Sequence, residues 1–151
     1  MSKSLIYKFI GVLFLGLFLG ACTSKNKEEV LPAGKHRVLV RLTAKSVEGL
    51  DAQYTIAREA GTATPVPLGA GRARDNATEE VDGGIQNSGE TIFVEVSFRA
   101  ITPTSTVRPN PAASYAVEIL VDGSVKTRVV INAASQLNNT YYLAAVAKTT
   151  L

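Results

Sequence analysis

Residues 92–99 have the sequence IFVEVSFR, and the alternation in this stretch decides the fold class. One side of an extended chain would carry the apolar positions Ile92, Val94, Val96 and Phe98, and the other side Phe93, Glu95, Ser97 and Arg99. Successive side chains of a β-strand point to opposite faces, so a repeat of two residues predicts a strand with one face buried.

The same repeat recurs along the rest of the chain. Apolar, β-branched or aromatic runs occupy residues 38–42, 54–57, 115–120, 125–131 and 140–147. No window of a dozen residues has convincing helical spacing. Short strands separated by Gly, Pro, Asn and Asp are typical of all-β folds. We therefore expect a single immunoglobulin-like antiparallel β-sandwich of six to eight strands over residues 35–151.

The runs on either side of Asp122-Gly123 predict a hairpin. A two-residue turn would place Ile119 opposite Lys126, so that an aliphatic side chain faces a charge. A three-residue loop that ends at Gly123, with this glycine in the left-handed position of a bulge, would place Glu118 opposite Lys126 instead. Because the second register pairs unlike charges, we expect the three-residue loop.

The connection from Ala60 to Gly89 is long for a small sandwich and contains six glycines and two prolines. A loop of this length either hides a strand or is a mobile functional segment. We expect one short hidden strand, over residues 65–69 or around Ile85, together with a flexible stretch around residues 69–75.

The N-terminus predicts export. Residues 1–8 contain two lysines and no acid, and the uncharged apolar run at residues 9–19 is too short to cross a hydrocarbon core of about 30 Å. The residues that follow, Leu19, Gly20, Ala21 and Cys22, resemble the lipobox of bacterial lipoproteins, in which the cysteine is acylated and becomes the new N-terminus. A short membrane anchor with an incidental cysteine is the alternative.

This resemblance implies three parts: a lipoprotein signal peptide at residues 1–21, a lipidated flexible tether at residues 22–34, and the sandwich. Lipid would consume the one cysteine of the chain, so no disulfide is expected within the domain. Lys27-Glu28-Glu29 resembles the signal that sends lipoproteins of Bacteroidetes-type bacteria to the cell surface, and a solvated linker is the alternative. The expected location is the cell envelope, lipid-anchored, at the outer membrane of a Gram-negative bacterium, on its periplasmic face or at the cell surface.

Residues 115–131, YAVEILVDGSVKTRVVI, resemble the closing hairpin of small secreted or lipid-anchored immunoglobulin-like proteins such as the MmpS-type family. Ser124 stands where that family often has lysine. The resemblance implies an accessory role at a membrane.

Charge and composition exclude several functions. Removal of Lys3 and Lys8 with the signal peptide would lower the formal charge from +3 to +1, so nucleic acid is not an expected partner. His36 is the one imidazole, which leaves no metal-ligand set and no obvious base for a nucleophile; its side chain is expected to be exposed. Neither a cofactor nor a catalytic residue is expected.

The acidic side chains also have ordinary explanations. The only calcium candidates, Asp75, Glu79, Glu80 and Asp82, are expected to form a solvated acidic turn. Glu95 and Glu118 are expected to be outward-facing strand positions and not a catalytic pair. Arg72 and Arg74 are expected to be solvated loop residues, and contact with an anionic surface is the alternative.

Aromatic side chains offer the remaining binding chemistry. Tyr54 and Phe98 are expected in the core. Phe93 lies on the face opposite Phe98, and alternation turns one ring of Tyr141-Tyr142 outward. Phe93, Tyr141 and Tyr142 are therefore the candidate binding residues, although such rings also simply cover the outside of a sheet.

These observations predict a lipid-anchored, non-catalytic accessory or structural component of a cell-envelope complex. Its partners would be membrane lipid, through acylated Cys22, and another envelope protein. The alternative is a surface-exposed binding module for a glycan or host ligand that uses an exposed aromatic ring or the segment from Ala60 to Gly89.

Overall fold

The computed structural model describes residues 30–61, 64–137 and 141–151, and residues 31–151 form one compact unit. The predictions made for the signal peptide, for Leu19, Gly20, Ala21 and Cys22, and for most of the tether lie outside the described residues. Among the residues that are described, none belongs to a helix long and apolar enough to cross a membrane.

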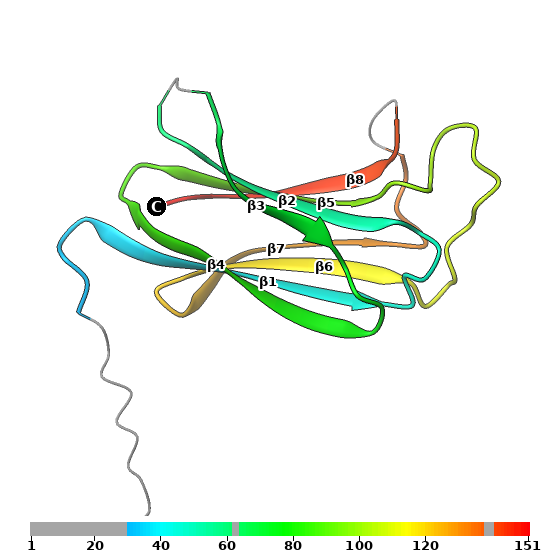
Figure 1. The fold of residues 1–151 in the computed structure, drawn as a ribbon, viewed down its shortest axis with the longest axis horizontal. Coiled ribbons are helices and arrows are strands. Elements are labelled where there is room, and N and C mark those ends of the chain that lie inside the picture. Colours follow the sequence, from blue (N-terminus) through cyan, green and yellow to red (C-terminus); the bar gives the residue numbers. More distant parts are fainter. Residues whose placement is uncertain (1–29, 62–63, 138–140) are drawn as a thin grey trace, which may run out of the picture. The chain divides into compact units, whose positions relative to one another are not determined.

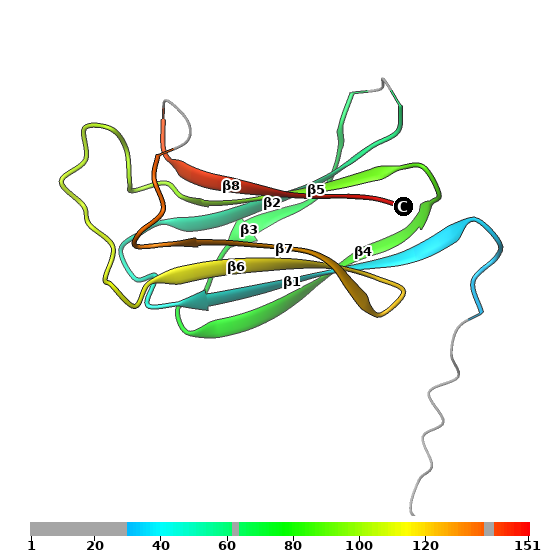
Figure 2. The same cartoon turned by 180° about the vertical axis from the view of Figure 1, so that it is seen from behind.

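Eight strands form two four-stranded antiparallel sheets that pack face to face (Figure 1, Figure 2). In chain order they are β1 (Lys35–Lys45), β2 (Ala52–Glu59), β3 (Val66–Arg72), β4 (Ala77–Asn87), β5 (Thr91–Phe98), β6 (Ser114–Val121), β7 (Ser124–Asn132) and β8 (Leu143–Thr150). One sheet has the order β4-β1-β6-β7 and the other β3-β2-β5-β8. The predicted all-β sandwich is confirmed, and its eight strands lie at the upper limit expected.

The core lies between the two sheets. The four alternating residues of β5, Ile92, Val94, Val96 and Phe98, are all completely buried, as their spacing predicts. The Phe98 ring stacks on the ring of Tyr115 from β6, with centroids 6.4 Å apart. All the side chains of the buried apolar cluster in the described chain lie between residues 38 and 147, so residues 31–151 contain a complete core.

The long connection contains two strands and not one. Residues 69–72, expected to be flexible, belong to β3 and pair with β2, and Ile85 lies in β4. The glycines in these two segments resemble loop residues in the sequence, but two of them are required by close packing. A Cβ on Gly71 would lie 2.8 Å from the Tyr54 hydroxyl, and one on Gly83 would lie 3.0 Å from a methyl group of Val38. These glycines permit close approach between elements and do not mark a loop.

The hairpin prediction was wrong about the turn. Asp122 and Gly123 alone form it, both at positive φ, and Val121 pairs directly with Ser124. A register shift beside Ile119 then places this residue opposite Thr127 and leaves Lys126 without a partner position. A bulge within β7, and not a three-residue turn, therefore keeps the charge of Lys126 away from the Ile119 side chain.

The two open sides of the sandwich differ. On one side Thr127 of β7 donates its hydroxyl hydrogen to the Lys148 carbonyl of β8 (3.0 Å), which ties the two sheets together. The opposite side is bounded by the edge strands β3 and β4. There the Tyr54 hydroxyl of β2 donates to Glu79 of β4 (3.3 Å), so polar side chains lie between the sheets.

Candidate functional site

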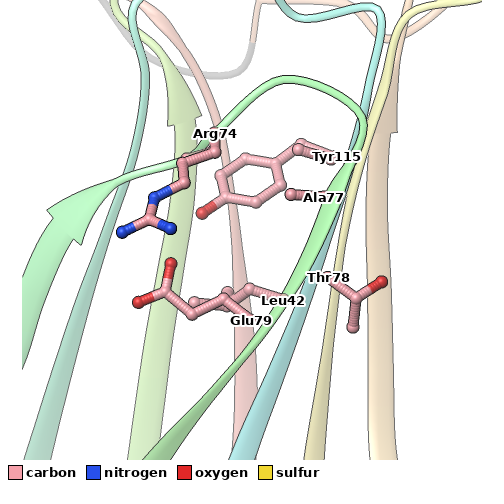
Figure 3. A pocket seen from close by; sticks show the side chains of 8 residues that line it. Leu42, Arg74, Ala77, Thr78, Glu79 and Tyr115 are labelled. Carbon is pink, nitrogen blue, oxygen red and sulfur yellow. The ribbon is translucent and has the colours of Figure 1, made fainter.

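A cavity of about 170 Å³ opens on the β4-β1-β6-β7 sheet beside the turn between β3 and β4, and we call it the edge cavity (Figure 3). It is lined by Leu42, Ala44, Ala73, Arg74, Ala77, Thr78, Glu79 and Tyr115. Five of these eight residues come from the segment between Ala60 and Gly89 that the sequence marked as a candidate functional segment.

Strand register places the acid of this cavity. Glu79 of β4 pairs with Leu42 of β1, whose side chain is buried in the core. Paired residues share a face of the sheet, so Glu79 is directed toward the space between the sheets although its strand is at an edge. The contact from the Tyr54 hydroxyl, which lies on the inner face of the other sheet, uses the Oε1 atom of Glu79. Its Oε2 atom remains for another donor.

The turn that carries Arg74 is held by side chains that accept hydrogen bonds from the β1–β2 connection. Oδ1 of Asp75 accepts from the amide of Val47 (2.6 Å), and Oδ1 of Asn76 accepts from the amide of Ser46 (3.1 Å). Arg74 itself has no ion pair with any residue in the described part of the chain. Arg74 is exposed, so the backbone of the turn, and not a contact of its guanidinium, brings the residue to the cavity.

Tyr115 contributes a buried hydroxyl group. Its side chain is completely buried, and within the described chain the hydroxyl has no hydrogen-bond partner. Burial raises the pKa of Tyr115 above its ordinary value, and nearby Tyr54 and Glu79 raise it further. The group therefore stays protonated at physiological pH. A buried polar group without a partner costs about 1–3 kcal/mol, so this hydroxyl favours any molecule that satisfies it.

Three polar groups converge on the edge cavity. Figure 3 shows the Arg74 guanidinium, the Tyr115 hydroxyl and the Glu79 carboxylate pointing toward one another. The guanidinium and the hydroxyl are donors, and the carboxylate is an acceptor. The remaining lining is largely alanine, leucine and the tyrosine ring. This arrangement can bind a small polar molecule, and it places two donors and one acceptor around it.

The predicted aromatic residues lie outside the edge cavity. Phe93 and Tyr142 both lie on the outer side of the β5–β8 pair, where the Tyr142 hydroxyl donates to Glu95 (3.1 Å) and the Arg99 guanidinium lies 3.6 Å from the centre of the Tyr142 ring. Burial raises the pKa of Tyr142, and Glu95 raises it further. Tyr141 is 73 % exposed and Tyr142 is half-buried, so neither ring of the pair belongs to the core.

A shallow groove of about 330 Å³ runs past Phe93, and we call it the Phe93 groove. It is lined by Thr55, Ala57, Glu59, Pro65, Phe93, Glu95 and Val146. The Lys148 ammonium lies 5.1 Å from the centre of the Phe93 ring. This ring is therefore partly covered by a neighbour on its own sheet, as expected for an aromatic that shields an outer face.

The outer face of the β4-β1-β6-β7 sheet carries several ion pairs. Arg41 contacts both Glu80 (2.9 Å) and Glu118 (3.2 Å), and Arg37 contacts Asp82 (3.0 Å). Glu118 pairs in register with Arg128, so the predicted partner Lys126 was wrong. Exposed pairs of this kind contribute at most about 1 kcal/mol each, and they describe a solvated face.

The acidic candidates do not form a common site. Glu80 and Asp82 turn to the outer face, Asp75 holds a backbone amide, and Glu79 enters the edge cavity. Across the described ranges no three His, Cys, Asp or Glu residues are grouped in a way that could hold a metal ion. Glu95 lies in β5 of one sheet and Glu118 in β6 of the other, so these two carboxylates do not face one cleft.

His36 is more constrained than expected. Its Nδ1 donates to Oδ2 of Asp122 (2.7 Å), its Nε2 lies 3.0 Å from Oγ of Ser88, and its side chain is 30 % exposed. The hydrogen bond from His36, followed by one from the Arg37 amide, lowers the pKa of Asp122. The imidazole thus connects the β6–β7 turn to the β4–β5 turn.

The order acid, imidazole, hydroxyl is also that of a serine-hydrolase triad. Such a site needs N–H groups that are free to stabilise an oxyanion. The amide of Ser88 already donates to the Gly34 carbonyl (2.9 Å), and the amide of Gly89 donates to the Leu151 carbonyl (2.7 Å). With both neighbouring amides engaged, these contacts favour a structural connection over catalysis.

Sequence reasoning missed the edge cavity. Glu79 and Arg74 are exposed, as predicted, but the sequence does not show that they line a cavity together with Tyr115, which it identifies only as part of a strand. One signal was present, because Ala77, Glu79 and Val81 alternate and share the face of β4 that meets the core.

Comparison of the chain with protein families, with curated proteins and with solved structures finds no match.

Proposed function

We propose that the chain is a lipid-anchored, non-catalytic protein of the bacterial cell envelope that serves as an accessory component of an envelope complex. The observation that carries this proposal is the sequence Leu19-Gly20-Ala21-Cys22 directly after a basic start and a short apolar run. Each buried CH₂ of an acyl chain contributes about 0.8 kcal/mol, so two or three chains on Cys22 give durable anchoring.

The position of the domain fits such an anchor. β1 begins at Lys35, which leaves residues 22–34 between the lipid and the first strand. A chain of this length reaches at most about 45 Å when fully extended. The domain would therefore act close to the membrane that holds it, at the distance expected of a subunit in an envelope complex.

Lipidation has a direct test. Cells that express the full chain and are fed a radioactive or alkyne-tagged fatty acid should label the wild type, whereas Cys22→Ala should lose the label and leave the membrane fraction. Thr23→Ala is the matched control and should keep both. An unlabelled wild-type protein would contradict the anchor. A labelled protein that yields no crosslinked envelope partner in cells would contradict the accessory role. The binding module would then be the remaining candidate function.

The non-catalytic part of the proposal is tested at Ser88. We expect no more reaction with a fluorophosphonate probe, which phosphonylates activated serines with loss of fluoride, for the wild type than for Ser88→Ala. The physical reason is the absence of free N–H donors at the neighbouring amides. Labelling that disappears in Ser88→Ala and in Asp122→Asn, with Ser124→Ala unchanged, would show an activated serine and overturn this part.

The edge cavity favours the second candidate, a binding module for a glycan. Arg74 and Glu79 lie on the segment that the alternative invoked, and the buried Tyr115 hydroxyl of β6, which has no partner in the described chain, faces the same space. An anchored accessory protein and a glycan-binding module are compatible, because the first depends on Cys22 and the second on the sandwich.

A further inference from the structure

We propose that the edge cavity is a binding site for a neutral sugar unit, recognised through two adjacent hydroxyl groups by Arg74, Tyr115 and Glu79. This inference rests on the binding-module alternative and does not depend on the lipid anchor. It is carried by the unpartnered, fully buried Tyr115 hydroxyl beside a cavity that also holds a guanidinium and a carboxylate.

The charges of the site favour a neutral ligand. Arg74 and Glu79 carry opposite charges, so the cavity has no net charge, and a simple anion or cation would meet one group of its own sign. Arg74 has no ion partner within the described chain and offers several N–H donors. A ligand with hydrogen-bond donors but no acceptor could not bind that guanidinium, so the ligand must also carry an acceptor.

The hydrogen-bonding pattern favours adjacent hydroxyl groups. A hydroxyl both donates and accepts, so one can accept from Arg74 and from Tyr115 while its neighbour donates to Oε2 of Glu79. Oε1 of Glu79 is already engaged by the Tyr54 hydroxyl, which orients the carboxylate. The site therefore offers two donors and one oriented acceptor, the combination that a vicinal diol satisfies without charge.

The size and lining of the cavity agree with one sugar ring. Its volume is about 170 Å³, close to the roughly 150 Å³ of an engineered apolar cavity that binds the six-membered ring of benzene. Alanine methyl groups from Ala44, Ala73 and Ala77 provide surfaces for the C–H groups of a ring. The cavity opens at the sandwich edge, where further units of a chain would continue into solvent.

The experiment uses residues 31–151, which contain the complete core, with saturation-transfer NMR and calorimetry. The probes are the methyl glycosides of glucose, galactose, mannose and N-acetylglucosamine, together with acetate and glycine as charged comparators. We expect at least one glycoside to bind and the comparators not to bind. Arg74→Ala and Glu79→Gln should each weaken binding about tenfold, the loss of one charge-assisted hydrogen bond.

Arg72→Ala is the matched control, because this neighbouring arginine is 77 % exposed and lies 3.6 Å from Asp51 outside the cavity. It should leave the affinity unchanged. Tyr115→Phe should weaken binding and should raise the urea midpoint of the free domain, because it removes the unpartnered hydroxyl.

Three results would overturn the proposal: no glycoside binds the folded wild-type domain, binding is unaffected by Arg74→Ala and Glu79→Gln, or acetate or glycine binds in place of the sugars. Because the fragment lacks Cys22, none of these results bears on the anchor, and failure of the anchor would not affect them.

Discussion

Replacement of Phe98 by alanine should lower the free energy of unfolding by about 3–5 kcal/mol, the usual cost of removing a large aromatic side chain from a core. Phe98 is completely buried and stacks on Tyr115 across the two sheets. The cavity left by the ring cannot fill easily, since its neighbours are strand residues fixed by backbone pairing on both sides. Urea denaturation followed by circular dichroism measures the loss.

Phe93→Ala is the matched control for this prediction. It removes the same side chain from the same strand, but on the outer face, where the Lys148 ammonium lies 5.1 Å from the centre of the ring. Its cost should be about 1 kcal/mol or less. Equal losses for the two variants would contradict the assignment of the faces of β5, on which the position of the core depends.

Replacement of Glu90 by alanine should cost about 2–4 kcal/mol, although the residue lies near the end of a strand. The Glu90 carboxylate accepts hydrogen bonds from the backbone amide and the side-chain amide of Asn87, both at 2.8 Å, and from Arg58 at 3.3 Å. Its side chain is only 10 % exposed. Alanine would leave the half-buried Arg58, whose Nε already lacks a hydrogen-bond partner within the described chain, without its carboxylate.

The same carboxylate makes stability depend on pH. Hydrogen bonds from the side chain and then the backbone of Asn87 lower the pKa of Glu90 in the folded protein. Its contribution is therefore fully present above the unfolded pKa of about 4.3 and is lost as the pH falls through the lower folded value. Urea midpoints measured from neutral to acid pH should fall for the wild type, and the fall should be smaller for Glu90→Gln.

Glu48→Ala provides the control, because Glu48 is exposed and has no ion pair in the part of the chain that the structure describes. Its stability should stay within about 0.5 kcal/mol of the wild type. A loss in Glu90→Ala no larger than that of Glu48→Ala would show that the contacts around Asn87 do not hold the β4–β5 turn.

Local patterning was sufficient for the strands that face the core on one side and solvent on the other. The alternation of Ile92, Val94, Val96 and Phe98 directly specifies which face is buried, and the structure agrees. It was insufficient for β3 and β4, because these edge strands carry glycines that exist for close packing. In the sequence, a glycine required by close packing looks the same as a glycine in a turn. Only the contacts of Gly71 with Tyr54 and of Gly83 with Val38 distinguish the two cases.

The edge cavity could not be predicted because it depends on pairing between distant segments. Glu79 lines the cavity because β4 pairs with β1 in the register that places Glu79 opposite Leu42. Tyr115 reaches the same space from β6, which pairs with the other side of β1. The β6–β7 hairpin was also mispredicted, over a short range of sequence. A bulge at Lys126 places Glu118 opposite Arg128, so unlike charges pair without the three-residue turn.

The direction of β1 separates the two ends of the domain. The chain enters β1 at Lys35, whereas the edge cavity lies beside Ala44, near the other end of this strand (Figure 1). At the usual rise per residue this interval is about 30 Å. A protein immobilised on a sensor chip through the residues before Lys35 would thus be attached about a full strand length from the cavity mouth. Attachment through the N-terminus should therefore leave ligand access unobstructed.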